Sequence, residues 1–265
     1  MDRQSTVFAA PEAFGRFSLE LQVALRAALE RARARGEDPP VAAFDADGTL
    51  WRGDASDDLL DWVHERGLLL VPATWPGERP QDATLKGYCD ALCHRSRPEA
   101  YAWAAAVYAG LELALVESWA AASWEVRGLH RVNPEMAALV KWLLSEGVRV
   151  TIVSASPWWA VVPGARHLGI VPEDVFAVDV DRDGTRLTGQ VRLPVTAGEG
   201  KVVRFDREVG RRPFLAAGNT VDDLALIEHA TQLGFVIDPR PPHGSTADLA
   251  AIAAERGFLV HHTGL

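Results

Sequence analysis

The stretch VAAFDADGTLW, residues 41–51, places two aspartates one residue apart at the end of a short apolar run. The run VAAF follows Pro39-Pro40 and is typical of a buried strand. In a strand, side chains at i and i+2 leave from one face, so we expect the carboxylates of Asp45 and Asp47 side by side. Neighbouring like charges repel unless a cation neutralises them. This pair lowers stability and therefore indicates a functional site.

The remainder of the chain alternates between strand-like and helical segments. Apolar runs typical of strands occupy 148–156, 175–180, 213–219, 233–238 and 258–262. Helical spacing of apolar residues occupies 134–147, 158–169, 201–210, 222–230 and 245–257. Strands that alternate with helices and are continuously apolar predict a parallel sheet covered on both faces. The near-repeat DRDGT at 181–185 stands between two β-like pieces, and we interpret it as a hairpin turn.

Residues from Ser56 to about Arg131 form the exception, because helical spacing fills this range and strand-like alternation is absent from it. The helical segments there are 58–67, 83–95 and a long Ala-rich stretch at 98–126. We therefore expect an N-terminal helical extension (1–36), an α/β core (37–54 and 131–265) and an inserted helical unit (55–130). The extension either packs on the core or forms a homodimer contact, and the sequence leaves both open.

Composition excludes several classes of protein. The net charge is −9 and no long basic block exists, so we expect no nucleic-acid partner. No run approaches the roughly 18 apolar residues of a membrane span, so we expect no membrane partner. The stretch MDRQSTVFAA lacks the features of a signal peptide, which predicts a cytoplasmic protein. The two cysteines, Cys89 and Cys93, are predicted to be reduced residues on one helical face.

Chemistry-bearing residues follow the predicted strands. Ligands of open α/β sheets bind beyond the carboxyl ends of the strands. At these ends we find Asp45 with Asp47, Ser154, and the run Asn219 to Asp223, while Lys201 opens a helix. Helix N-termini and lysine attract phosphate, and clustered carboxylates attract Mg²⁺. The combination predicts a site for a metal-bridged phosphate.

Four motifs, namely DADGTLW at 45–51, Ser154 after VTIV, Lys201 and GNTVDD at 218–223, resemble in order those of the haloacid dehalogenase-like (HAD) hydrolases. The stretches VTIVSASPWW and DGTRLTGQ resemble the phosphoserine phosphatase-like branch, and the insertion is similar to its helical cap. The resemblance implies a Rossmann-like parallel sheet flanked by helices, with an inserted all-helical cap. It also implies a Mg²⁺-dependent phosphatase acting on a small phosphorylated metabolite.

The same resemblance implies roles for individual residues. Asp45 would be the nucleophile that forms an aspartyl-phosphate, and Asp47 the general acid and base. The residues expected to bind the phosphate are Ser154, Ala155, Lys201, Gly48 and Thr49. The residues expected to bind Mg²⁺ are Asp45, Asp47 through its backbone carbonyl, Asn219 and Asp223. The family most often has aspartate where this chain has Asn219, so the sequence leaves open whether Asn219, Asp222 or Asp223 binds the metal directly.

Other functions and substrates stay open. HAD-type phosphoryl transfer to an acceptor other than water fits the same motifs, and Asn219 alone supports a catalytically weak module that binds phosphate esters. A dehalogenase is disfavoured, because Asp47 would have no role in one. The ester itself could be phosphoserine-like, phosphocholine-like or another. The residues considered for substrate recognition are Asp54 for an amine, Arg95, Arg97 and Arg127 for a carboxylate, and Trp51, Trp62, Trp103, Trp119, Trp124, Trp158 and Trp159 for a quaternary ammonium, although these tryptophans are better explained as helix packing.

Overall fold

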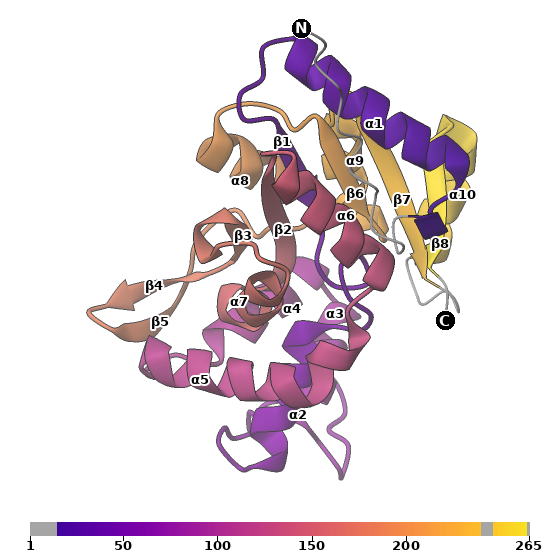
Figure 1. Cartoon of the computed structure of the whole chain (residues 1–265). Coiled ribbons are helices and arrows are strands. Elements are labelled where there is room, and N and C mark those ends of the chain that lie inside the picture. Colours follow the sequence, from indigo (N-terminus) through magenta and orange to yellow (C-terminus); the bar gives the residue numbers. More distant parts are fainter. Residues whose placement is uncertain (1–14, 240–245, 264–265) are drawn as a thin grey trace, which may run out of the picture.

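The computed structural model describes residues 15–239 and 246–263 and contains a six-stranded parallel sheet (Figure 1). The strand order is β3-β2-β1-β6-β7-β8. The strands are β1 (Val41–Phe44), β2 (Arg149–Pro157), β3 (Val175–Val178), β6 (Leu215–Gly218), β7 (Leu233–Pro239) and β8 (Leu259–Thr263). The α/β prediction is therefore confirmed, and every apolar run assigned to a strand contributes one to this sheet.

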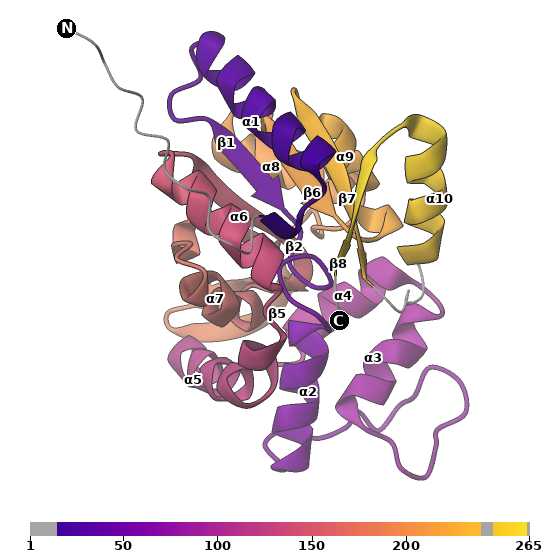
Figure 2. The same ribbon diagram turned by 45° about the vertical axis from the view of Figure 1, so that its right-hand side comes forward.

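Both faces of the sheet are covered by helices. Ala42 and Phe44 of β1 belong to a core shared with α1 (Leu19–Ala34), α6 (Pro134–Ser145) and α7 (Trp158–His167). Val41 and Ala43 point to the other face, which packs on α8 (Glu199–Val209) and α9 (Leu224–His229). Farther along that face, α10 (Thr246–Arg256) covers β7. Figure 2 shows α1 and α6 in front of the sheet, with α8 and α9 behind it. The alternation along β1 thus specifies two buried faces.

The N-terminal helix packs on the core. Ser18 caps α1, and Leu21, Leu25 and Leu29 are buried along its inner side. A salt bridge of 2.9 Å joins Arg33 to Glu146 after α6. Of the two arrangements left open by the sequence, packing on the core is therefore observed. A homodimer stays a prediction.

The residues between β1 and α6 form helices beyond the carboxyl ends of the strands, in the lower part of Figure 1. They are α2 (Ala55–Glu65), α3 (Leu85–Cys93), α4 (Arg97–Ala106), α5 (Leu113–Ser123) and two short helical turns, η2 (Trp124–Gly128) and η3 (Leu129–Arg131). We call α2 to α5 the cap helices. Cys89 and Cys93 are free cysteines on α3. The domain limits 1–36, 37–54 with 131–265, and 55–130 stay a prediction.

The Ala-rich stretch 98–126, which was predicted to be helical, is divided into two helices, α4 and α5. It breaks between α4 and α5, where Gly110 adopts a φ of +84° that favours glycine. Backbone groups at the break pair with a distant hairpin, because the Gly110 N–H donates to the Leu187 carbonyl and the Leu187 N–H donates to the Leu111 carbonyl. The hairpin consists of β4 (Val180–Asp183) and β5 (Arg186–Val191), which confirms the interpretation of DRDGT as a turn.

No helix within residues 15–239 and 246–263 combines the length and the apolar character needed to cross a bilayer.

Candidate functional site

Three adjacent strands bring the predicted residues to one edge of the sheet. Asp45 follows β1, Ser154 lies in the last part of β2, and Asn219 follows β6. β1 pairs with β2 on one side and with β6 on the other, and all three strands are parallel. Lys201 reaches the same edge from the first turn of α8. The topology therefore assembles the four motifs around the carboxyl end of β1.

Lys201 links the motifs directly. Its ammonium nitrogen Nζ donates to Asp45 Oδ1 at 2.6 Å, to Asp223 Oδ1 at 2.6 Å and to the Val153 carbonyl at 2.8 Å. These three bonds use all donors of the ammonium group. Its side chain is 1% exposed, so one buried cation holds two buried carboxylates in place.

Asp223 organises the loop after β6. Its second oxygen, Oδ2, accepts from the backbone N–H groups of Asn219 and Thr220 and from the Thr220 hydroxyl. Thr220 and Asp223 form a capping box for the short helical turn η5 (Val221–Asp223). Both carboxylate oxygens of Asp223 are thus engaged within the protein. The metal-binding role expected for Asp223 stays a prediction, and the contacts present assign it to orienting Lys201 and the loop.

Asp47 is held by a separate set of partners. Its Oδ1 accepts from Trp51 Nε1 and from the Ala55 N–H, both at 2.7 Å, and its Oδ2 accepts from the Ser156 hydroxyl at 2.6 Å. β1 ends at Phe44, so the strand alternation that placed Asp47 beside Asp45 does not extend this far. The two carboxylates share no hydrogen-bond partner among the described residues, and Asp47 faces the start of the cap.

Burial determines the electrostatics of the site. Burial, together with repulsion from Asp223, raises the pKa of Asp45 to about 7, although Lys201 opposes the rise. Burial also raises the pKa of Asp47. Burial alone would lower the pKa of Lys201, but attraction to Asp223 and Asp45 outweighs it and raises that pKa. When Asp45, Asp47 and Asp223 are all ionised, the site contains three carboxylates and one ammonium group, and this excess of negative charge attracts cations.

The side of the site open to a ligand lies at Asp47, Gly48 and Ala155, which are half-buried. Ser154 is buried, and its Oγ accepts from the Ser156 N–H at 3.1 Å. Thr49 is buried as well and donates to Asp45 Oδ2 at 3.0 Å. A phosphate would therefore approach Asp45 past Asp47, Gly48 and Ala155.

The oxygen atoms near Asn219 could bind a hard cation such as Mg²⁺ through a combination of carboxylate and carbonyl ligands. Within residues 15–239 and 246–263, no three His, Cys, Asp or Glu side chains are grouped so that they could hold a metal. However, one terminal atom of the Asn219 carboxamide lies 3.0 Å from the Asp47 carbonyl oxygen and 3.2 Å from Asp45 Oδ2. Neighbouring oxygens of an octahedral Mg²⁺ site with 2.0–2.1 Å bonds lie about 3 Å apart. One carboxylate and two carbonyl oxygens can therefore share such an ion.

Gly48 makes room for this arrangement. Its φ is +80°, and a Cβ at this position would lie 2.0 Å from the second terminal atom of the Asn219 side chain. Any other residue would be strained and would displace Asn219.

A joint between cap and core lies beside the site. Arg97 at the start of α4 forms a 2.7 Å salt bridge with Asp222, and the Tyr101 hydroxyl donates to the same carboxylate at 3.0 Å. Arg97 Nε also donates to the Tyr101 oxygen at 3.2 Å. The Asp222 carbonyl accepts from the N–H of Gly198, which precedes α8. Arg97, considered from the sequence for a substrate carboxylate, thus binds the protein's own Asp222.

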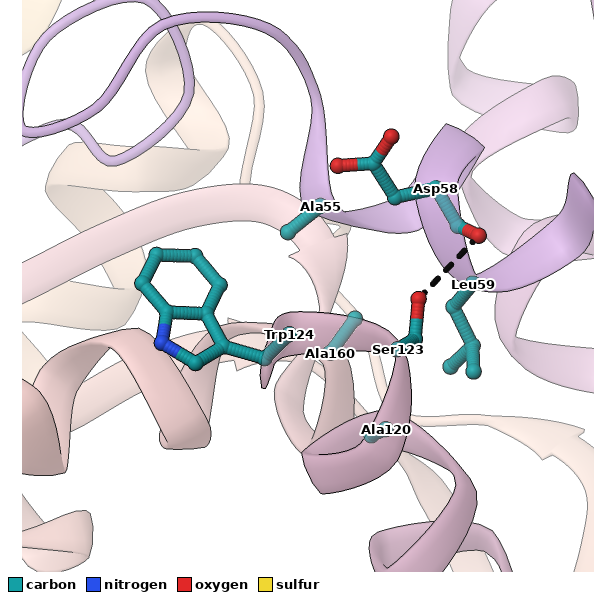
Figure 3. A pocket seen from close by; sticks show the side chains of 7 residues that line it. All are labelled: Ala55, Asp58, Leu59, Ala120, Ser123, Trp124 and Ala160. Atoms are coloured by element: carbon teal, nitrogen blue, oxygen red, sulfur yellow. Dashed lines mark hydrogen bonds between the residues drawn. The ribbon is translucent and has the colours of Figure 1, made fainter. Parts of the chain in front are cut away.

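Two hollows flank the cap helices. A mainly apolar groove of about 550 Å³ lies between the start of α4 and the segment before Lys201, and Pro98, Leu193, Pro194, Val195, Ala197 and Gly200 line it. A cavity of about 10 Å³ lies where α2, α5 and α7 meet, with Asp58, Ser123 and Trp124 in its wall (Figure 3). The cavity offers the space of about one water molecule, so it cannot hold a substrate.

The remaining candidates for substrate recognition are mostly engaged in packing or pairing. Trp51, Trp124 and Trp159 are buried, and the rings of Trp51 and Trp124 meet edge to face at 4.9 Å. Arg127 pairs with Glu65 within the cap. Asp54 caps α2 by accepting from the Asp57 N–H.

The roles of Ser156 and Tyr101 were not predicted from the sequence. Ser156 lies two residues after Ser154, and this spacing is the only signal that could have indicated it. Tyr101 carries no sequence signal, because its partner lies 121 residues away.

Several solved structures have a similar fold. The fold is similar to that of a protein of unknown function from Bordetella pertussis Tohama I, with 20% identity, a TM-score of 0.67, and coverage of 83% of this chain and 96% of that one. It is similar to a functionally unknown protein from Anaerococcus prevotii DSM 20548, with 14% identity, a TM-score of 0.71, and coverage of 93% and 92%. It is also similar to a substrate-bound phosphoserine phosphatase, with 15% identity, a TM-score of 0.51, and coverage of 84% and 93%.

No curated protein matches the sequence. Residues 42–228, well over half of the chain, match the haloacid dehalogenase-like hydrolase family. The matched range starts in β1, includes all four motifs and ends in α9. The chain therefore belongs to the haloacid dehalogenase-like hydrolases.

Proposed function

We propose that the protein is a Mg²⁺-dependent phosphatase that hydrolyses a phosphomonoester of a small metabolite through an aspartyl-phosphate. The observation that supports this most strongly is the buried lysine, Lys201, held between Asp45 and Asp223 at the edge of the sheet. A carboxylate beside a fixed ammonium group can receive a phosphoryl group, because the cation offsets the charge that would otherwise repel it.

In the first step, an oxygen of Asp45 attacks phosphorus and the bond from phosphorus to the ester oxygen breaks. Oδ1 is the better candidate, because Oδ2 lies against the Asn219 carboxamide and accepts from the Thr49 hydroxyl. Asp47 donates its proton to the leaving oxygen. The raised pKa of Asp47 suits this role, since a carboxyl group must be protonated to act as an acid.

In the second step, Asp47 accepts a proton from water, the water oxygen attacks phosphorus, and the bond to Asp45 breaks. Inorganic phosphate leaves, and both aspartates return to their initial states. Lys201 keeps its charge throughout, because its pKa is raised. Ser154 and the backbone of Ala155 are the groups in our proposal that orient the phosphoryl oxygens. Thr49 would act through Asp45, to which its hydroxyl donates, and Gly48 through the room it leaves.

Asp45 Oδ2, the Asp47 carbonyl and the Asn219 carbonyl would hold the Mg²⁺ ion. When bound, the ion would neutralise phosphate charge and polarise phosphorus toward attack. Asp223 would act through Lys201 and the loop rather than through the ion.

The test is the release of inorganic phosphate from p-nitrophenyl phosphate and from a metabolite panel that includes phosphoserine and phosphocholine. We expect turnover with Mg²⁺ and loss of turnover with EDTA. Asp45→Asn should lower kcat by at least about 10³-fold, as loss of a nucleophile does. Asp183→Asn is the matched control, because Asp183 belongs to the same DxDGT string in the exposed hairpin and should leave kcat unchanged.

Two results would contradict the proposal. If none of the phosphate esters in the panel is hydrolysed in the presence of Mg²⁺, the protein is not a phosphatase of such esters. Consumption of the ester without free phosphate, accompanied by a new phosphorylated product, would identify phosphoryl transfer instead.

A further inference from the structure

The Asn219 carboxamide occupies an unusual position for a neutral side chain. It is 5% exposed, and one of its two terminal atoms faces three oxygens, which are the Asp47 carbonyl at 3.0 Å, Asp45 Oδ2 at 3.2 Å and Thr49 Oγ1 at 3.3 Å. Thr49 gives its own hydroxyl hydrogen to Asp45 Oδ2, so its oxygen is free to accept. If that atom is the amide oxygen, Thr49 Oγ1 is the one neighbour that can donate to it, and the other two neighbours are acceptors. With the amide nitrogen in that position, all three contacts become hydrogen bonds, so the metal-free site favours the nitrogen there.

Two of these oxygens are the ones that would share a divalent cation with Asn219. An amide group is nearly symmetric in shape, so a half-turn about its last torsion exchanges nitrogen and oxygen and moves little else. After the half-turn, the amide oxygen would stand about 3 Å from Asp47 O and Asp45 Oδ2, as neighbouring ligands of Mg²⁺ do. Gly48 leaves the space in which the carboxamide lies.

The charges around Asn219 explain why a neutral side chain matters. Asp45 and Asp223 already share the single ammonium group of Lys201, and Asp47 is hydrogen-bonded to neutral groups only. A further carboxylate at position 219 would place a fourth acid in a site that has one ammonium group whenever no divalent ion is bound. The amide instead supplies hydrogen-bond donors to the same oxygens.

We propose that Asn219 is a two-position residue that replaces the cation in the metal-free protein and becomes a ligand when the cation binds. The amide nitrogen satisfies Asp45 and the Asp47 carbonyl without metal, and the amide oxygen joins them around the ion. The chain therefore folds stably without metal and exchanges Mg²⁺ readily. The proposal rests on the proposed function for placing a cation here, and it requires no turnover.

The experiment measures Mg²⁺ binding and thermal unfolding without any substrate. Asn219→Asp should lower the Kd for Mg²⁺ at least tenfold, because it adds a negative charge among the ligands. Without metal, Asn219→Asp should have a lower Tm than the wild type, and Mg²⁺ should raise its Tm by more than it raises that of the wild type. EDTA should leave the wild-type Tm almost unchanged. If the Asn219→Asp variant can be purified as a folded protein only in the presence of Mg²⁺, its unfolding after addition of EDTA supports the proposal equally.

The matched control is Asn133→Asp. Asn133 is also buried, and its amide lies beside the site, 3.4 Å from the Thr49 carbonyl, but it does not face the three oxygens. This variant should lower the Tm without tightening Mg²⁺ binding. The proposal is overturned if Asn219→Asp binds Mg²⁺ no more tightly than the wild type, if its metal-free Tm equals the wild-type value, or if EDTA strongly destabilises the wild type. A wild type without turnover that meets the binding and unfolding expectations would refute the proposed function alone.

Discussion

Among the described residues, a lysine stands between two aspartates twice, once in the core and once in the cap. Lys201 stands between Asp45 and Asp223, each 2.6 Å away, and Lys86 on α3 stands between Asp57 and Asp90, at 3.3 and 2.7 Å. The side chain of Lys201 is 1% exposed, whereas that of Lys86 is 34% exposed. In the core, water cannot solvate Lys201 or its carboxylate partners if a pair is broken, so the folded state requires both ion pairs. In the cap, water can solvate Lys86 and its partners, so these ion pairs contribute little to stability.

The largest expected difference follows from removing each lysine. Lys201→Met leaves two buried carboxylates without their cation and should lower the free energy of unfolding by about 3–5 kcal/mol. Lys86→Met removes a pair that is screened by solvent and should lower it by less than about 1 kcal/mol. Urea unfolding of both variants measures the difference. Equal losses in the free energy of unfolding would show that burial does not make the Lys201 pairs more important for stability than the Lys86 pairs.

The pH dependence of stability should sharpen the same comparison. Burial raises the pKa of Asp45 to about 7 and that of Asp57 to about 6, from an ordinary value of 3.8. A carboxyl group whose pKa is raised by folding binds more protons in the folded state, so stability falls as pH rises. The fall assigned to Asp57 ends near pH 6, and that assigned to Asp45 continues to about pH 7.

In metal-free protein, Asp45→Asn should therefore flatten the decline in the free energy of unfolding up to about pH 7. Asp57→Asn should flatten it only up to about pH 6. Chemical unfolding at a series of pH values gives both profiles. If the two variants change the same pH range, the deeper burial of Asp45 has no electrostatic consequence.

The sequence predicted the parts of this molecule that follow local rules. The strands were recognisable because both of their faces are apolar, as Val41 to Phe44 illustrate. The convergence of Asp45, Ser154 and Asn219 followed, because parallel strands present their carboxyl ends at one edge. Lys201 was recognisable from its position in the first turn of a helix.

Features that depend on distant partners were not predictable. The helix break at Gly110 exists because its backbone pairs with Leu187 in a hairpin that lies far along the chain. The engagement of Asp223 with Lys201 and the orientation of Asn219 likewise depend on several loops meeting at one point. Residue type and spacing show that these groups are close, but not which of them become partners.

The smallest expected effect concerns the joint between cap and core. The pair Arg97–Asp222 joins α4 to the loop after β6, whereas Arg127–Glu65 joins two segments within the cap. Asp222→Asn should weaken the joint by about 1 kcal/mol, the upper range for a partly exposed pair. Local opening of α4 would then become about fivefold more frequent, and amide hydrogen exchange across Arg97–Ala106 should accelerate by the same factor.

Glu65→Gln is the matched control, since it removes a bridge that does not reach the core. It should leave exchange in α4 unchanged, and exchange in α1 should be unchanged in both variants. Arg97→Met should reproduce the effect of Asp222→Asn, and the double variant should add little to either, because both changes remove the same contact. Faster exchange in Glu65→Gln, or additive effects in the double variant, would mean that α4 is held by its packing on β2 rather than by Asp222.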